Sequence, residues 1–275
     1  PNPDLKWEST TQLNIGLNVG LFNDRITLTA DYYNKQTNDL LLRRPLPSSS
    51  GFSSITENVG KVENKGIEIS LETQNFIGDN FTWNTQFNIS GNRNEVLELY
   101  NGQPIDDIGR GGNRIMEGQP IGVFYSYESL GVNPSTGDIV YADTNFDGQI
   151  TSADRTIVGN PHPDFIFGLT NNFTYKGIDL TIFLQGSYGN DVFNGSRLFL
   201  ESLQGGDNQL TAVTRRWQQP GDITDIPRAT TDPIASAQNK RVSSRFIEDG
   251  SYMRVKNVTL GYTIGNNTLE KTMFS

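Results

Sequence analysis

The stretch that decides the fold is FIFGLTNNFTYKGIDLTIFLQGSY, from Phe165 to Tyr188. Apolar residues alternate with Gly, Thr, Asn, Gln and Ser on both sides of the dipeptide Lys176-Gly177, with Phe183 as the exception. A period of two places alternate side chains on opposite faces of a β-strand. Two such runs joined by a two-residue connection are typical of a β-hairpin. The stretch therefore predicts two antiparallel strands, each with one apolar face and one polar face.

Five further segments alternate in the same way, which gives seven predicted strands. They are residues 13–21, 26–32, 67–72, 81–90 and 257–264. Short connections are predicted at Phe22–Asp24, Asn75–Asn80 and Lys176–Gly177, and long ones at Leu42–Lys65, Arg93–Pro163 and Asp191–Ser251. Because short and long connections alternate along the chain, we expect all the long ones to leave the same end of the strands.

A soluble β-sandwich would show the same period, so the composition of the polar face is informative. That face is mostly small and uncharged, which suits the water-filled interior of a barrel better than the charged surface of a soluble protein. Aromatic residues such as Trp83, Tyr175 and Tyr188 lie near predicted strand ends, as in the aromatic girdles of membrane barrels. We predict an all-β chain: residues 1–275 form an antiparallel transmembrane β-barrel segment with long extracellular loops.

Seven strands do not close a wide barrel, and an open sheet edge is not stable in lipid. We therefore expect the remaining strands to lie elsewhere in a longer protein. The chain begins at Pro1 without Met or a signal peptide, which favours the same interpretation.

Composition excludes several functions. The net charge of −9 argues against nucleic acid as a partner, because phosphate binding requires a basic face. The chain has no cysteine, which excludes disulfides and thiolate metal sites. Its only histidine, His162, leaves no partner for zinc ligation or for a Ser-His-Asp triad and is interpreted as a loop residue. No apolar run approaches the ~18 residues of a membrane helix. We predict no catalytic residues.

A calcium-type loop is the sharpest local motif, and it lies inside the long 93–163 connection. Residues 143–154 read DTNFDGQITSAD, which matches the spacing of an EF-hand loop. The predicted ligands are the side chains of Asp143, Asn145, Asp147 and Asp154 and the backbone carbonyl of Gln149. Asp154 replaces the usual Glu at the twelfth position, and the flanking residues show no helical period. We therefore predict a structural calcium ion that holds an extracellular loop.

Two alternatives from other classes remain open at this point. A secreted, soluble, calcium-stabilised β-sandwich that binds carbohydrate would also explain the acidity, the aromatics and the loop. A glycoside hydrolase would need a carboxylate pair, such as Asp106 with Asp107 or Glu95 with Glu98. Substrate-binding residues are not identifiable from the sequence. Arg215, Arg216 and Trp217 are ligand-contact candidates, although a solvated loop is the simpler interpretation.

Six motifs resemble the SusC/RagA family of TonB-linked outer-membrane proteins, in the order in which that family has them. They are Pro3–Leu17, Asp31–Leu41, Asn58–Glu68, Gly118–Tyr127, the calcium-type loop Asp143–Asp154 and Gly159–Phe165. Together they cover nearly the whole chain.

The resemblance implies a transporter of ~22 strands, closed by an N-terminal plug that this sequence does not contain. It implies uptake of glycans or peptides, with energy relayed through TonB, which would contact the absent N-terminal part. It also implies a SusD-like surface lipoprotein as a lid over the extracellular loops. The expected location is the bacterial outer membrane, with its lipid around the strands.

Overall fold

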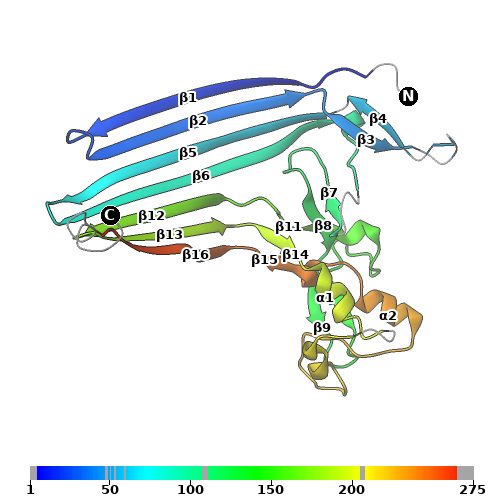
Figure 1. Ribbon diagram of the computed structural model, residues 1–275. Coiled ribbons are helices and arrows are strands. Elements are labelled where there is room, and N and C mark those ends of the chain that lie inside the picture. The colour runs from blue at the N-terminus through cyan, green and yellow to red at the C-terminus, as the bar shows by residue number, and fades with distance from the viewer. Residues whose placement is uncertain are drawn as a thin grey trace.

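The computed structural model describes residues 5–46, 49, 51–52, 54–58, 60–106, 111–204 and 208–264. Its main element is one antiparallel sheet of seven strands in the order β1-β2-β5-β6-β12-β13-β16 (Figure 1). The strands are β1 (Ser9–Leu21), β2 (Ile26–Asn38), β5 (Gly60–Ile77), β6 (Phe81–Leu99), β12 (Phe165–Tyr175), β13 (Ile178–Tyr188) and β16 (Tyr252–Tyr262). All seven predicted strands are confirmed. Strands that are neighbours in the sheet follow one another along the chain, apart from the elements inserted in the long connections.

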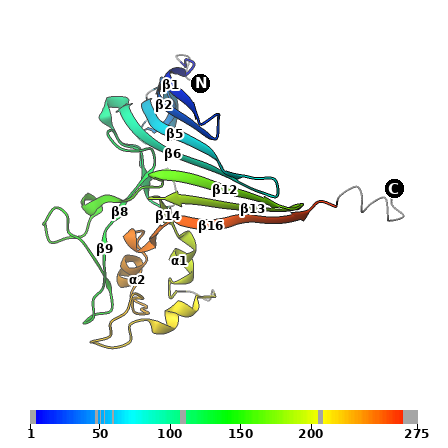
Figure 2. The ribbon, with the colours of Figure 1, turned by 90° about the vertical axis from the view of Figure 1, so that its left-hand side faces the viewer.

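The two ends of the sheet differ, as the connection lengths predicted. Figure 1 shows the β1–β2, β5–β6 and β12–β13 turns at one end and all the longer connections at the other. Figure 2, viewed from the short-turn end, shows the sheet as an open, curved wall. At the β12–β13 turn, Lys176 and Gly177 have φ of 48° and 84°. Positive φ at both central residues gives the turn whose twist matches the flanking strands.

The longer connections carry the remaining elements. Three small sheets are pairs: β3 (Leu41–Pro45) with β4 (Ser54–Asn58), β9 (Ser129–Val132) with β10 (Ile139–Tyr141), and β14 (Asp191–Phe193) with β15 (Ile247–Asp249). A fourth has three strands, with β8 (Val123–Tyr127) between β7 (Asn113–Arg114) and β11 (Arg155–Gly159). The helices are α1 (Gly195–Leu200) and α2 (Pro233–Asn239), with 3-10 turns η2 (Tyr100–Gly102), η3 (Ser152–Asp154), η4 (Thr211–Arg215) and η5 (Ser244–Phe246). No helix in the described part of the chain is both long and apolar enough to cross a membrane.

Several strands are longer than their apolar alternation indicated, and β5 and β6 extend into the predicted connections. β5 begins at Gly60, although residues up to Lys65 were predicted as a connection, and β6 runs through Arg93 to Leu99. Most of the added pairs are polar, including Lys65 opposite Arg93 and Glu63 opposite Glu95, and Val62 opposite Val96 is an isolated apolar pair. Hydrophobic alternation does not detect such pairs, so the predicted boundaries at Lys65 and Arg93 were wrong.

Fully buried apolar side chains gather at the loop end of the sheet. One cluster joins Val62 and Val96, from the ends of β5 and β6, to Leu99 and Ile115. A second group lies among the loops and includes Ile139, Ile226 and Phe246, each at most 1% exposed. The long connections therefore have a packed interior of their own.

Candidate functional site

The apolar face of the sheet is uncovered. Leu13, Leu17 and Leu260 are 57%, 57% and 72% exposed, although all three lie within regular strands. In the sandwich alternative these side chains would pack against a second sheet. No second sheet covers this face in the described residues, and the sandwich hypothesis is wrong. Only a nonpolar solvent satisfies so many leucine, isoleucine and phenylalanine side chains.

The height of the apolar face matches the hydrocarbon layer of a membrane. From Phe165 to Tyr175, β12 spans about 33 Å, which corresponds to about 25 Å of depth at the usual strand tilt. Rings stack at both limits of this band: Phe165 with Tyr188 at 5.2 Å and Trp83 with Phe173 at 5.7 Å between centroids. These pairs lie where the predicted aromatic girdles would meet the headgroups.

One polar group on the apolar face was not anticipated from the sequence. Asn171 lies among the outward residues of β12, where its Oδ1 accepts hydrogen bonds from Trp83 Nε1 at 2.9 Å and from Thr85 Oγ1 at 2.7 Å. Asn75 Nδ2 donates to the same Thr85 oxygen at 2.6 Å. These hydrogen bonds satisfy Asn171 Oδ1, Trp83 Nε1 and Thr85 Oγ1, which lowers the cost of placing these atoms in lipid.

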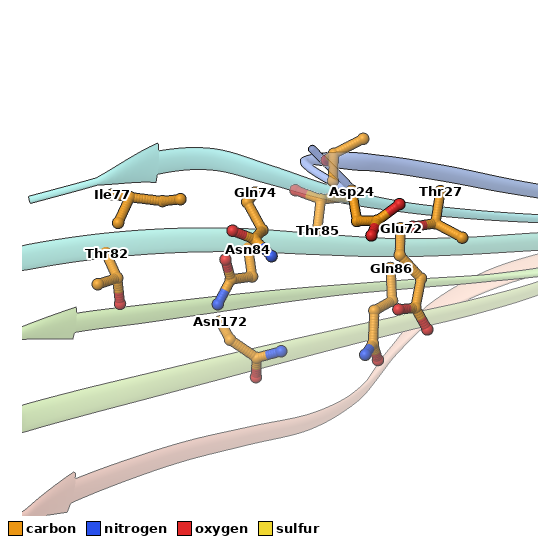
Figure 3. A pocket seen from close by; sticks show the side chains of 11 residues that line it. Asp24, Thr27, Glu72, Gln74, Ile77, Thr82, Asn84, Thr85, Gln86 and Asn172 are labelled. Atoms are coloured by element: carbon orange, nitrogen blue, oxygen red, sulfur yellow. The ribbon is translucent and has the colours of Figure 1, made fainter. Parts of the chain in front are cut away.

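The opposite face is a polar wall with a shallow hollow of about 450 Å³ near the short turns. Figure 3 shows the side chains of β2, β5, β6 and β12 that surround it. Most are amides and hydroxyls; the charged ones are Asp24 and Glu72. Polar side chains of this face form hydrogen bonds between neighbouring strands; for example, Thr181 Oγ1 donates to Asn172 Oδ1 at 2.8 Å. Amides both donate and accept, so this wall suits a neutral polar solute or water.

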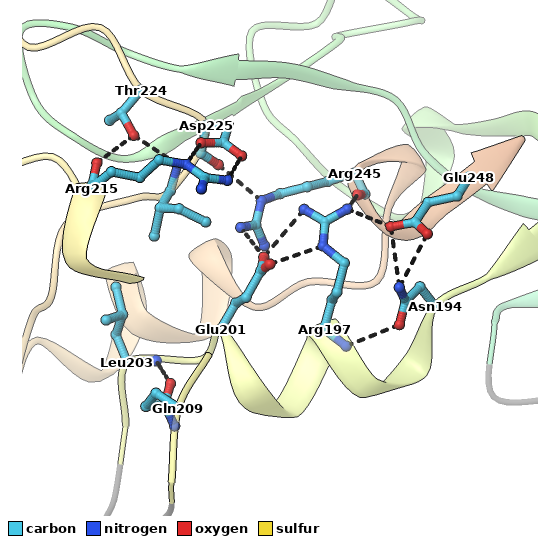
Figure 4. Close-up of polar contacts among 11 residues, drawn as sticks. Asn194, Arg197, Glu201, Leu203, Gln209, Arg215, Thr224, Asp225, Arg245 and Glu248 are labelled. Carbon is cyan, nitrogen blue, oxygen red and sulfur yellow. Dashed lines mark hydrogen bonds and ion pairs between the residues drawn. The ribbon is translucent and has the colours of Figure 1, made fainter. Parts of the chain in front are cut away.

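Two of the long connections fold into one unit, which we call the loop cap: residues 111–159 together with the described residues 191–204 and 208–249. Figure 4 shows its main ionic cluster. The buried Glu201 carboxylate accepts hydrogen bonds from Arg197 Nε at 2.9 Å and from Arg245 Nη2 at 2.6 Å. Arg197 also pairs with Glu248 at 2.8 Å. Burial lowers the pKa of the Arg245 guanidinium, and Arg197 holds the pKa of Glu248 below its ordinary value.

A second set of contacts joins the two halves of the cap across the sequence. Asp138 forms a bidentate pair with Arg228 at 2.8 and 3.0 Å and accepts a hydrogen bond from Asn239. Trp217 Nε1 donates to the carbonyl of Pro134, and its ring covers Gly137. Tyr141 Oη donates to the carbonyl of Gln238, and burial raises the pKa of this phenol to about 12.

Two of the ligand-contact candidates therefore already have structural partners. Trp217 belongs to the cap contact just described. Arg215 makes a bidentate pair with Asp225 at 2.8 and 2.9 Å, which lowers the pKa of that carboxyl to about 2.

The calcium-type loop is a tight turn held by its own side chains. Asp143 accepts hydrogen bonds from the backbone N–H of Asp147 and Gly148, at 3.2 and 2.8 Å, while Asn145 Oδ1 and Asp147 Oδ1 accept from later N–H groups. Phe146 and Gly148 have φ of 59° and 81°. The spaced oxygens at Asp143, Asn145 and Asp147 thus lie on one turn, as the motif requires.

Asp154 is held differently from the other predicted ligands. Its buried carboxylate accepts hydrogen bonds from the N–H of Thr151 at 2.7 Å and of Thr144 at 3.0 Å, which lower its pKa. Asp154 thereby joins the two ends of the loop. Among the described residues, no three His, Cys, Asp or Glu side chains gather into a group that could hold a metal. Gln149, expected to contribute its carbonyl, donates its N–H to Asp147.

Other candidate residues also have structural contacts. The Nε2 atom of His162 lies 2.8 Å from the carbonyl oxygen of Ile121. Asp106 forms an ion pair with Arg114, which lowers the carboxyl pKa, and its proposed partner Asp107 lies outside the described residues. Glu95 and Glu98 both belong to the loop end of β6.

The sheet is curved and antiparallel, with one apolar and one polar face, short turns at one end and folded loops at the other. This combination defines an outer-membrane β-barrel protein. Comparison with known proteins narrows this class. Residues 1–272 match the model of the family described as "TonB dependent receptor-like, beta-barrel". The chain belongs to this family of outer-membrane receptors and transporters, which confirms the resemblance drawn from its motifs.

Individual relatives agree with this assignment. TonB-dependent receptor P3 of Formosa agariphila is 38% identical over 98% of this chain, and TonB-dependent receptor SusC of Bacteroides thetaiotaomicron is 31% identical over 96%. The solved structure of the RagAB peptide transporter superposes with a TM-score of 0.84 at 27% identity, covering 99% of this chain and 31% of that one. The chain spans 28% and 27% of the lengths of the two curated relatives.

Proposed function

We propose that this chain forms part of the barrel wall of a TonB-dependent importer of peptides or glycans. The observation that carries the proposal is the two-faced sheet: the apolar side meets lipid and the amide-lined side borders an aqueous path. Membership of this family, together with the similarity to SusC and to the RagAB peptide transporter, supports nutrient uptake as the role of the whole protein. Transport, not catalysis, is the role we assign, with energy relayed through TonB.

The partner we propose is a SusD-like surface lipoprotein lying over the loop cap. The cap supports this because it is a packed body, held by the Glu201 cluster and the Asp138–Arg228 pair, that can present a fixed surface. Loops with such an interior lose less entropy on binding than flexible ones do.

Uptake by cells tests the proposal. Cells with and without the intact receptor are given fluorescent peptides and fluorescent oligosaccharides of similar size, with an uncoupler of the proton gradient as control. One class should accumulate only when the receptor is present and the gradient intact. Uptake of both classes that is unchanged by deleting the receptor would contradict the importer assignment.

We also propose that the loop at residues 143–154 binds Ca²⁺, with Asp143, Asn145, Asp147, Asp154 and the carbonyl of Gln149 as ligands. The alternating oxygens on one tight turn support the proposal. A bound ion would stabilise the loop cap, by about 2.7 kcal/mol at a concentration 100 times its dissociation constant.

Calcium titration of the intact receptor after chelator treatment tests this site. Protease resistance of the cap should rise with calcium in the unmodified protein and should not respond in Asp143→Ala. Glu128→Gln, which removes an exposed carboxylate outside the loop, is the matched control and should respond normally. A calcium response that persists in Asp143→Ala would contradict the assigned ligands.

A further inference from the structure

On the outward face of β5, β6 and β12, the rows of side chains change in chemistry towards the short turns. Three successive rows, read from the middle of the strands, are apolar, polar and aromatic. Their members, paired in register, are Leu71, Phe87 and Leu169, then Thr73, Thr85 and Asn171, then Phe76, Trp83 and Phe173. One polar row therefore lies between two apolar ones, on the side of the sheet that meets lipid.

The amide of Asn171 is only half satisfied within this row. Its Oδ1 accepts hydrogen bonds from Trp83 and Thr85, whereas its Nδ2 group donates to no atom of the described residues. The side chain is half-buried, so this donor is not sealed inside the sheet. An amide N–H without an acceptor is costly in hydrocarbon. We therefore expect the acceptor to come from outside the sheet.

A cation lies on the same side of the sheet, at the β12–β13 turn. Lys176 Nζ is 5.4 Å from the centroid of the Tyr175 ring, which is the last outward side chain of β12. Lys176 is exposed and pairs with no carboxylate of the described chain.

The amide and the cation approach each other in depth. The backbones of Asn171 and Lys176 differ by about 13 Å along the membrane normal at the usual strand tilt. Both side chains turn into this interval, because Asn171 is bonded by Trp83 from the next row and Lys176 lies back over Tyr175. A hydrogen-bond donor and a positive charge thus border one strip of the lipid-facing surface.

We propose that this strip binds a phospholipid of the periplasmic leaflet, with an acyl ester carbonyl at Asn171 Nδ2 and the phosphate at Lys176. The short turns of outer-membrane barrels lie on the periplasmic side, where the leaflet consists of phospholipid. From the bilayer centre outward, such a lipid presents acyl chains, ester carbonyls and a phosphate. This is the order of the apolar row, Asn171 and Lys176.

The chemistry of the two contacts fits the same occupant. An ester carbonyl only accepts hydrogen bonds and an unpaired amide N–H only donates them. An ammonium group binds phosphate oxygens through charge-assisted hydrogen bonds. Trp83 and Tyr175, which lie between the two contacts in depth, are the residue types enriched at the level of the headgroups.

This inference depends on the outer-membrane location and not on which solute is imported. Lipid retention by the intact receptor, measured by native mass spectrometry of the detergent-solubilised protein, tests it. The probes are diacyl phosphatidylglycerol, its dialkyl ether analogue, which lacks the carbonyls, and diacylglycerol, which lacks the phosphate. The unmodified protein should retain the diacyl phospholipid about fivefold better than either analogue, the effect of one hydrogen bond.

Two variants separate the two contacts. Asn171→Leu should retain ester and ether lipids equally while still preferring phospholipid to diacylglycerol. Lys176→Gln should show the reverse, an ester preference without a phosphate preference. Asn172→Leu and Lys35→Gln change the same residue types on the polar face, and both controls should keep the pattern of the unmodified protein.

Heat-modifiable migration on gels confirms that each variant is folded. Equal retention of ester and ether lipids by the unmodified protein, or an ester preference that persists in Asn171→Leu, would overturn the proposal. Loss of receptor oligomers in Asn171→Leu with unchanged lipid retention would also overturn it, because a neighbouring protein would then supply the acceptor.

Discussion

At the residue scale, Gly137 shows how closely the two halves of the loop cap fit. Its φ is +77°, and an added Cβ would overlap the ring of Trp217. Gly137→Ala should therefore destabilise the cap by about 1–3 kcal/mol, through backbone strain together with a steric clash. Gly118 has nearly the same φ, +75°, with nothing near its Cβ position. Gly118→Ala should cost less. Proteolysis of the cap ranks the two variants, and an equal or reversed order would contradict the packing of Trp217.

The Asp138–Arg228 pair predicts a pH dependence at the same scale. Hydrogen bonding by the Arg228 guanidinium lowers the pKa of Asp138 in the folded protein. The pair therefore contributes fully above the unfolded pKa of about 3.9, and its contribution is lost as pH falls through the folded value. Amide exchange near Asp138 and Arg228, referenced to β12, should rise below about pH 4. Asp138→Asn should exchange faster at neutral pH and change little on acidification; identical pH profiles would exclude this pair as the cause.

At the element scale, the two faces of one strand should respond oppositely to charge. Leu169 faces outward in the middle of β12, and Thr170 faces the polar side. Leu169→Lys should cost about 2–4 kcal/mol of folding free energy in lipid vesicles, because an ammonium enters the hydrocarbon layer. Thr170→Lys should cost far less. Denaturant titration of the intact barrel in vesicles measures both, and an equal cost at the two positions would be inconsistent with a lipid-facing Leu169.

The central strands were predictable because their two faces differ in polarity, as Phe167, Leu169 and Phe173 show beside Gly168 and Thr170. The loop ends of β5 and β6 were not, because both faces are polar where Lys65 meets Arg93. The outward position of Asn171 was also missed. Its cost depends on hydrogen bonds from Trp83 and Thr85, residues more than 80 positions away along the chain.

The fold of the loop cap was not predictable from the sequence, because its core has no local pattern. Its interior brings together single apolar residues from distant segments, such as Ile139, Ile226 and Phe246, without a local period. The calcium-type motif was found because its predicted ligands are close together in the sequence; the structure shows the tight turn, and the ion stays a prediction. The pair of β3 and β4, which lies mostly in the 42–65 connection, also lacked a signal, since its strands are short and β3 does not alternate.

At the scale of the whole molecule, one face of the sheet should border lipid and the other face should border water. The 275 residues contain no cysteine, so single cysteines introduced along Ile166–Tyr175 meet no background thiol from this part of the receptor. In the membrane-embedded receptor, each single-cysteine variant is first reacted with a water-soluble maleimide, which reports access from water. The same cysteine is then spin-labelled, and relaxation of the label by oxygen, which dissolves in lipid, reports contact with the membrane.

Alternation of the two signals along β12 tests most directly whether this sheet separates lipid from water. Cysteines at positions 168, 170, 172 and 174 should react with the maleimide, whereas labels at 167, 169 and 173 should relax with oxygen. The opposite phase, or water accessibility at every position, would contradict the assignment of this sheet to a barrel wall.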